Sequence, residues 1–128
     1  MSKVILDASA LIALIQEEKG GEVIKPLLKD SVMSTINIAE VLTSLQRVGI
    51  FPDDAIVIMQ SIVGTVIPFD VTHAQKAAML YPLVKHRGLS LADRACISLG
   101  ISMHLPIYTA DKIWAELNLE NADIRLIR

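Results

Sequence analysis

Short apolar runs alternate with longer segments of mixed polarity along the whole chain. The runs lie at residues 4–6, 31–34, 65–69, 106–109 and 124–127. Each run is too short for a helix, and most are rich in β-branched residues. Such short, nearly continuous apolar segments are typical of strands that are covered on both faces. The pattern therefore predicts five short strands.

Amphipathic segments that suit helices separate these runs. We predict helices over residues 9–16, 22–29, about 35–48, from 52 onward, 71–86, 90–103 and 112–117. Pro26 should limit the regularity of the second helix, Gly49 should end the third, and Thr72 to Gln75 fit a capping box. Strands that alternate with helices predict a three-layer α/β sandwich, in which helices flank a central, mostly parallel sheet. We expect one domain over residues 1–128.

Four acidic residues fall where such a fold places its binding sites, beyond the carboxyl ends of the strands. Asp7 directly follows the first predicted strand, and Asp111 closely follows the fourth. Glu40 lies early in the helix after the second strand, and Asp93 lies in the first turn of the helix that begins near Ser90. We expect all four carboxylates to face the same rim of the sheet.

Each acid also has a structural explanation, because acidic side chains cap the N termini of helices. The positions that fit capping are Asp7, Asp111, the pair Ser90–Asp93 and the pair Asn37–Glu40. Ser9 is an alternative cap for the first helix, which would leave Asp7 free. Glu40 also shares a helical face with Ser44 and Arg47, and this face could simply be solvated. A carboxylate has enough lone pairs to cap a helix and bind a metal at once, so both explanations stay open.

Carboxylates gathered in one place need a counter-charge. Two of them about 5 Å apart repel by roughly 3 kcal/mol at an effective dielectric near 20. Shared protons or a cation would relieve this repulsion. A set of oxygen ligands without His or Cys favours Mg²⁺, with Mn²⁺ as an alternative. We therefore predict a divalent metal site at this rim.

Composition limits the classes of protein that remain. The formal net charge of −2 provides no global basic field for nucleic acid. Lys85, Arg87 and Arg94 cluster in sequence and could hold phosphates, although the first two also suit an ordinary solvated helix end. Hydrophobic residues make up 52% of the chain, so some apolar surface is expected to meet a partner, and we predict a homodimer.

The single cysteine, Cys96, excludes an internal disulfide and fits a reduced, cytoplasmic setting. No signal peptide is recognisable. The longest uncharged run, residues 55–69, is too short and too polar for a membrane span, so no membrane association is expected.

Four stretches taken together resemble one known family. "VILDAS", "NIAEV", "GLSLADRACISLG" and "IYTADKIW" resemble, in order and spacing, the PIN-domain ribonucleases, and more closely the VapC-type toxins of toxin–antitoxin pairs. The resemblance implies a PIN-like fold and metal-dependent endoribonuclease activity on structured RNA, such as transfer or ribosomal RNA. It also implies a homodimer, and a cognate antitoxin that wraps the toxin and inserts a side chain into the acidic pocket.

The resemblance also implies roles for individual residues. Asp7, Glu40, Asp93 and Asp111 would be the catalytic, metal-binding acids, and the polar residues that orient them would be Ser9 and Thr109. Two positions depart from the family pattern. Ala8 stands where Ser or Thr is frequent, and Arg94 stands where a small residue is usual. Arg94 could therefore bear on contact with the substrate or the antitoxin.

Two other classes remain open. A Mg²⁺-dependent α/β phosphohydrolase or a receiver domain also places Asp after the first strand. A haloacid-dehalogenase-type phosphatase would, however, need an acid at position 9, where Ser9 stands. A non-catalytic binding module that uses its acids only as helix caps is the second alternative, and metal binding distinguishes it from the enzymes.

Overall fold

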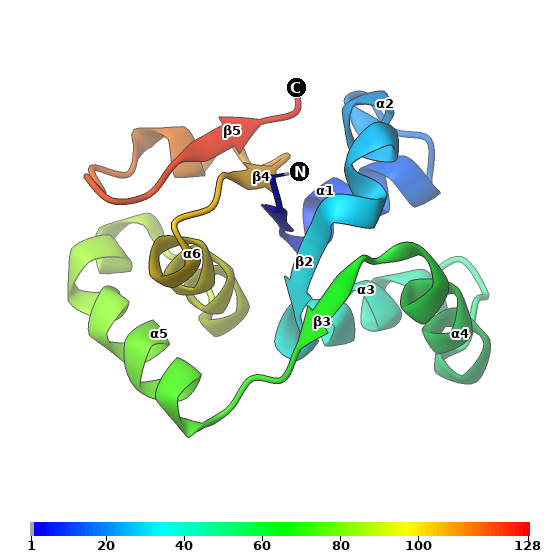
Figure 1. The fold of residues 1–128 in the computed structure, drawn as a ribbon, viewed down its shortest axis with the longest axis horizontal. Coiled ribbons are helices and arrows are strands. Elements are labelled where there is room, and N and C mark those ends of the chain that lie inside the picture. The colour runs from blue at the N-terminus through cyan, green and yellow to red at the C-terminus, as the bar shows by residue number, and fades with distance from the viewer. Residues whose placement is uncertain (1) are drawn as a thin grey trace.

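A computed structural model describes residues 2–128 and contains one five-stranded sheet in which every strand pairing is parallel. The sheet order is β3-β2-β1-β4-β5 (Figure 1). The strands are β1 Val4–Leu6, β2 Ser31–Ser34, β3 Thr65–Ile67, β4 Ile107–Thr109 and β5 Ile124–Leu126. The α-helices are α1 Ala8–Ile15, α2 Gly21–Ile24, α3 Thr35–Gln46, α4 Pro52–Ile62, α5 Val71–Val84 and α6 Leu91–Met103. The 3-10 helices are η1 Lys25–Asp30, η2 Lys85–Arg87 and η3 Lys112–Glu116.

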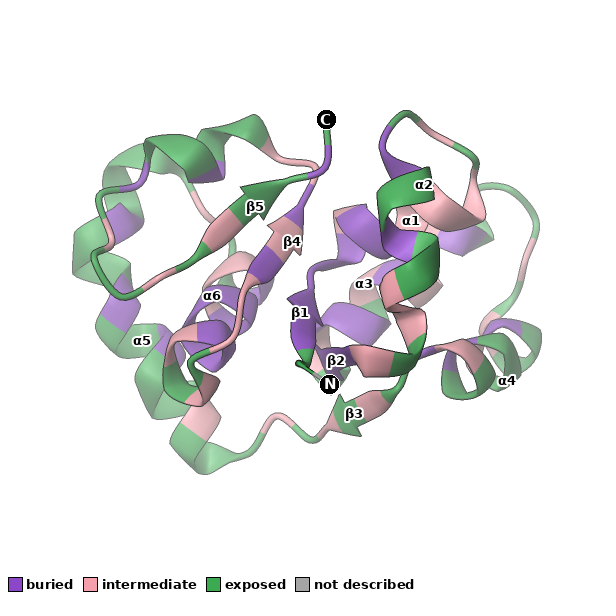
Figure 2. Ribbon diagram, turned by 45° about the horizontal axis from the view of Figure 1, so that its top comes forward, coloured by how far each residue is buried: buried purple, intermediate pink, exposed green. Residues whose placement is uncertain are grey.

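Helices cover both faces of the sheet, as predicted. Side chains alternate along each strand, so neighbouring residues of β1 enter different cores. Leu6 packs with α1, α3 and α4 on one face, whereas Ile5 packs with α5 and α6 on the other. Figure 1 shows these two groups of helices on opposite sides of the sheet, and Figure 2 shows that β1 and β2 between them are buried. The three-layer prediction is confirmed.

The structure departs from the predicted elements at a few boundaries. The helix predicted over 22–29 divides into α2 and η1, because Pro26 cannot donate an α-helical hydrogen bond. The strand predicted over 65–69 ends at Ile67, because Pro68 has no N–H to donate to a neighbouring strand. The prediction that Thr72 caps α5 is wrong. Asp70 is the cap, and its Oδ1 accepts from the backbone N–H of His73 at 3.0 Å.

The strand order creates a crevice at the site of interest. After β1 the chain builds one half of the sheet through β2 and β3, and it then crosses through α5 and α6 to β4, on the other side of β1. The order therefore reverses between β1 and β4, which lie side by side with Ile5 opposite Ile107. Ligands of open α/β sheets bind beyond the strand ends at such a reversal.

No helix within residues 2–128 combines the length and the apolar character that crossing a membrane requires.

Close packing of α6 on β4 fixes this half of the sheet. Gly100 lies on α6, and a Cβ atom added there would overlap the side chain of Ile107. We expect Gly100→Ala to lower the free energy of unfolding by roughly 1 kcal/mol, because overpacking costs about 1–3 kcal/mol while better helix propensity returns about 1 kcal/mol. Urea denaturation measures the change. In an Ile107→Ala background the same substitution should cost less or stabilise, and equal costs in both backgrounds would contradict this packing.

Candidate metal and active site

Asp7 is a buried carboxylate at the point where the strand order reverses. It follows β1 directly, and its backbone N–H still donates to the carbonyl of Tyr108 on β4 at 3.1 Å. The side chain is 5% exposed. Its Oδ1 accepts from the Ala10 N–H at 2.9 Å, so Asp7, and not Ser9, caps α1. The hydroxyl of Thr109 donates to Oδ2 at 2.6 Å.

Two hydroxyl groups connect Asp7 to the segment that follows β4. Ser9 Oγ lies 2.7 Å from Asp7 Oδ1 and accepts from the Ala110 N–H at 2.9 Å. Thr109, which donates to Asp7, also accepts from the Asp111 N–H at 3.0 Å. Both hydroxyls thus accept from the β4 segment and donate to the same carboxylate. Ser9 and Thr109 therefore both contact the carboxylate of Asp7, and their role in orienting a metal ligand stays a prediction.

Glu40 enters the same region from α3. It is partly buried, and its Oε1 accepts from the side-chain amide of Asn37 at 3.1 Å. The second amide hydrogen of Asn37 reaches the carbonyl of Ala92 on α6 at 3.0 Å. Asn37 is 1% exposed, and its Oδ1 has no hydrogen-bond partner within residues 2–128. Asn37 therefore fixes Glu40 on α3 relative to the first turn of α6, where Asp93 follows Ala92.

Asp93 and Asp111 both keep the capping roles that their sequence suggested. Asp93 forms a capping box with Ser90: its Oδ2 accepts from the Ser90 N–H at 3.0 Å, and its own N–H donates to the Ser90 hydroxyl at 3.1 Å. Asp111 Oδ1 accepts from the Ile113 N–H at 3.0 Å and so caps η3. Each carboxylate retains lone pairs beyond these bonds.

The acids influence one another electrostatically. Burial first, and the nearby Asp93 to a smaller extent, raise the pKa of Asp7 to about 6, against the hydrogen bonds from Thr109, Ala10 and Ser9, which lower it. Burial and Asp93 also raise the pKa of Glu40. Burial and then Asp111 raise the pKa of Asp93, while its Ser90 hydrogen bonds and Arg94 lower it.

The same acids also affect the thiol of Cys96. It is fully buried in α6, and its pKa is raised first by burial and then by Asp7, Asp93 and Glu40. A single buried group therefore lies near three carboxylates that come from three different elements. The structure thus brings the predicted acids to one region, as the strand-end rule requires.

These acids fit an oxygen-binding cation but do not form a complete cage. Among residues 2–128, no three Asp, Glu, His or Cys side chains are already placed to hold one ion together. The donor set is all carboxylate oxygen, which suits Mg²⁺ or Mn²⁺. Burial first, and neighbouring carboxylates second, raise the pKa values of Asp7, Glu40 and Asp93. Side chains would have to rearrange for an ion to bind. Asp7 and Thr109 form the rigid part of the site.

The basic residues that were predicted to touch substrate already have protein partners. Arg94 donates from Nη1 to the carbonyl of Ala77 at 3.0 Å and lies over the ring of Tyr81, so its guanidinium faces α5. Arg87 pairs with Glu116 at 3.0 Å. The Lys85 side chain makes no hydrogen bond or ion pair within residues 2–128, although its carbonyl accepts from the Gly88 N–H. Substrate contact by these residues stays a prediction, and both arginines would first have to leave their partners.

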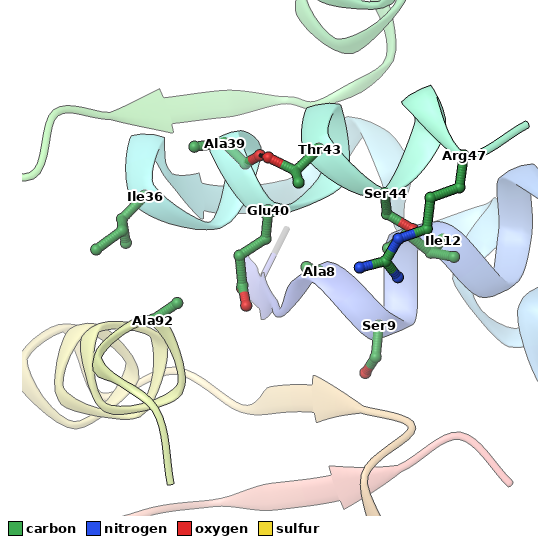
Figure 3. Close-up of a pocket in the computed structure, with 10 residues that line it drawn as sticks. All are labelled: Ala8, Ser9, Ile12, Ile36, Ala39, Glu40, Thr43, Ser44, Arg47 and Ala92. Atoms are coloured by element: carbon green, nitrogen blue, oxygen red, sulfur yellow. Dashed lines mark hydrogen bonds between the residues drawn. The ribbon is translucent and has the colours of Figure 1, made fainter. Parts of the chain in front are cut away.

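A groove of about 570 Å³ opens beside Glu40 (Figure 3). The residues that line it come from α1, α3 and the first turn of α6, and they are Ala8, Ser9, Ile12, Ile36, Ala39, Glu40, Thr43, Ser44, Arg47 and Ala92. Figure 3 shows Glu40 and Arg47 both extending from α3 toward α1. The groove is therefore continuous with the acidic region.

Sequence reasoning missed Asn37 as a positioning residue and Arg47 as a groove residue. Asn37 was interpreted as part of a helix cap, yet Ser34 caps α3. The only signal was the common helical face of Asn37, Glu40, Ser44 and Arg47, which also fits a solvated surface. The partner on α6 is 55 residues away, so no local pattern could indicate it.

Comparison with known proteins yields a family match and several similar structures. The family model described as "PIN domain" matches residues 4–119. No curated protein matches the sequence. A chain of the DNA-bound VapBC from Salmonella typhimurium aligns with a TM-score of 0.73 at 14% identity and covers 100% of both chains.

Two other solved structures show the same fold. A chain of a toxin–antitoxin complex from Klebsiella pneumoniae aligns with a TM-score of 0.74 at 15% identity, over 98% of each chain. A chain of VapBC-5 from Mycobacterium tuberculosis, a toxin–antitoxin system of the VapBC family, has a TM-score of 0.64 and 20% identity. It covers 100% of this chain and 99% of that one. At such low identities these matches establish the fold.

The charge of Asp7 is expected to destabilise the metal-free protein at neutral pH. Its pKa is about 6 in the folded state against 3.8 ordinarily, so folding becomes less favourable as the pH rises from 4 to 6. This pKa difference corresponds to a loss of about 3 kcal/mol in the free energy of unfolding once the pH exceeds 6. We expect Asp7→Asn in chelator to be more stable than the parent by up to this amount near neutral pH. The gain should disappear near pH 4, as measured by urea denaturation.

Asp70 provides a control of opposite sign. It is exposed, and the His73 N–H lowers its pKa, so its contribution is present at neutral pH and is lost on acidification. Asp70→Asn should therefore destabilise the protein at neutral pH. If Asp7→Asn behaves like Asp70→Asn, the assigned burial of Asp7 is wrong.

Proposed function

Because this chain belongs to the PIN domain family, we propose that it is a Mg²⁺-dependent endoribonuclease toxin. It would hydrolyse phosphodiester bonds in structured RNA such as transfer or ribosomal RNA. The observation that carries the proposal is the hydrogen-bond network at the crevice where the strand order reverses. It joins Asp7 through Thr109 to Asp111, and Glu40 through Asn37 to the first turn of α6, which carries Asp93. Residues 1–128 would form a single nuclease domain that acts in the cytoplasm.

The four acids would bind the ion in different ways. Asp7 and Asp93 are suited to direct ligation, because Asp7 is fixed by three hydrogen bonds and Asp93 by its capping box. Glu40 and Asp111 would ligate directly or through water. Mg²⁺ is the proposed ion, and Mn²⁺ would substitute for it. When bound, such an ion would neutralise charge on the phosphate that is cleaved and lower the pKa of water.

The chain's own groups would orient the reactants. Asn37 holds Glu40 Oε1, and no bond to Glu40 Oε2 is recorded within residues 2–128. The raised pKa of Glu40 makes it a suitable acceptor for a proton from the attacking water. Ser9 and Thr109 would keep the carboxylate of Asp7 from rotating. Mutation of residues that hydrogen-bond to metal ligands typically lowers metal affinity or activity by about 10–100-fold.

We propose a cognate antitoxin as the physiological partner, which would wrap the toxin and insert a side chain into the acidic pocket. The similar structures support this, because those named above are VapBC or toxin–antitoxin complexes. The groove beside Glu40 offers apolar surface next to the acids, which suits a polypeptide ligand as well as a nucleic acid.

Removing either proposed direct ligand should abolish cleavage. We expect Asp7→Asn and Asp93→Asn each to lower RNA cleavage in Mg²⁺ by at least about a hundredfold, beyond the effect of a neighbouring hydrogen bond. Gel analysis of end-labelled RNA measures cleavage, and circular dichroism verifies the fold. Asp53→Asn, which changes an exposed acid in the first turn of α4, should leave the rate unchanged. Full activity of either site variant would refute the assignment.

Calorimetric titration with Mg²⁺ and Mn²⁺ separates the proposal from its main alternative. Binding to the parent protein that is lost in Asp7→Asn supports the enzyme. A parent protein that binds neither ion would indicate a non-catalytic module whose acids only cap helices.

We also propose a homodimer. Met79, Tyr81 and Leu83 are exposed on α5, and an apolar groove of about 310 Å³ separates α5 from α6. Sedimentation at micromolar concentration should give twice the mass of the chain, and Leu83→Lys should shift the equilibrium toward the monomer. Lys29→Gln, which changes an exposed charge on η1, should not. A monomeric parent protein at this concentration would contradict the proposal.

A further inference from the structure

Among the arginines of residues 2–128, Arg47 is the one whose side chain forms no hydrogen bond or ion pair with another residue of that range. Arg87, Arg125 and Arg128 form ion pairs, and Arg94 is bound to the carbonyl of Ala77. The backbone N–H of Arg47 donates to the carbonyl of Ser44 at the end of α3, but its guanidinium forms no hydrogen bond or ion pair with residues 2–128, and the side chain lines the groove beside the acids. Figure 3 shows its guanidinium directed into the space between α3 and α1.

The groove thus carries opposite charges at two points along α3, with Glu40 between Ile36 and Arg47 (Figure 3). Glu40 and Arg47 lie seven residues apart, which corresponds to two turns or roughly 10 Å along the helix. Between them the lining contains only small, apolar or hydroxyl side chains, among them Ile12, Thr43 and Ser44. An elongated ligand in this groove would meet Glu40, with any ion that the acids bind, and about two helical turns further along would meet the guanidinium of Arg47.

A single RNA strand matches this arrangement. Successive nucleotides of a stacked strand rise by about 3.4 Å, the value for DNA, so phosphates two or three nucleotides apart would span roughly the separation between Glu40 and Arg47. A guanidinium pairs with a phosphate through two parallel hydrogen bonds. The small side chains of Ala8 and Ser9 on α1, opposite Glu40, leave room for the backbone between these contacts (Figure 3).

We propose that Arg47 binds a phosphate of the RNA at a distance from the cleaved bond, and that the groove between α1 and α3 is the path of the substrate strand. This inference rests on the proposed nuclease function. It gives Arg47 the same role, binding a phosphate of the substrate, that the sequence predicts for Lys85, Arg87 and Arg94. Arg47 would not touch the reacting atoms, so it would contribute to binding and not to the chemical step.

The test uses the full chain with Asp93→Asn to prevent cleavage, a 5′-fluorescent RNA hexanucleotide, and Mg²⁺. Fluorescence anisotropy over a series of KCl concentrations gives the Kd and its salt dependence. We expect Arg47→Gln to raise the Kd roughly fivefold, as for one partly exposed ionic contact. The slope of log K against log salt should decrease by about 0.7, the value for one phosphate of a single strand.

Matched variants make the result specific. Arg47→Lys keeps the charge and should retain most of the salt slope. Lys29→Gln removes one exposed positive charge at the opposite end of the strands and should change neither quantity. With Asp93 intact, Arg47→Gln should raise KM and leave kcat unchanged, because a remote contact binds substrate and transition state equally.

The failing outcomes are distinguishable. If the parent protein neither binds nor cleaves RNA, the proposed function itself is wrong. If the parent cleaves RNA but Arg47→Gln keeps its Kd and slope, or if Lys29→Gln weakens binding equally, only the role of Arg47 is overturned. A fluorescent hexaglutamate peptide tests the other class of ligand. If Arg47→Gln weakens this peptide and not the RNA, the groove binds an acidic polypeptide and the inference is overturned.

Discussion

The desolvation of Asp7 is the constraint on which the rest of the site depends. β1 and β4 are adjacent, so the residue after β1 is covered by the segment that follows β4. Water can no longer stabilise the carboxylate there, and the protein substitutes the Ala10 N–H and two hydroxyl groups. These bonds do not offset burial completely, because the pKa of Asp7 remains raised. The fold therefore places a buried carboxylate, which a cation would stabilise, at the position where ligands of such sheets bind.

The acids of this site also hold the fold together. Asp7, Asp93 and Asp111 each cap a helix, so the groups proposed to bind a cation also fix the ends of the elements that carry them. This double use explains why the capping and the metal-binding interpretations of the sequence do not compete. Capping orients a carboxylate and occupies some of its lone pairs, and the others stay available. Mutual repulsion within the cluster lowers stability in return, as is common at functional sites.

Neutral polar side chains supply much of the geometry. Thr109 and Ser9 connect two strand ends, and Asn37 connects α3 to α6. All three contacts join segments from different parts of the chain. Because each buried donor or acceptor costs free energy when it lacks a partner, such links fix a single arrangement. The guanidinium of Arg47 contrasts with these groups. It forms no hydrogen bond or ion pair within residues 2–128, and it faces an open groove where a ligand can reach it.

The sequence by itself determined the strands, the parallel three-layer architecture and the acids at the strand ends, because apolar periodicity and strand-end position are local properties. The tertiary structure decided which contacts those residues make. Arg94 follows Asp93 in the sequence, and the packing of α6 on α5 directs its guanidinium to Ala77 and Tyr81, a contact that no local pattern indicates. Asn37 looked like a cap, but Ala92 gives it a partner across the crevice. Hydrogen bonds between distant segments depend on how helices pack, and no local pattern of residues encodes that packing.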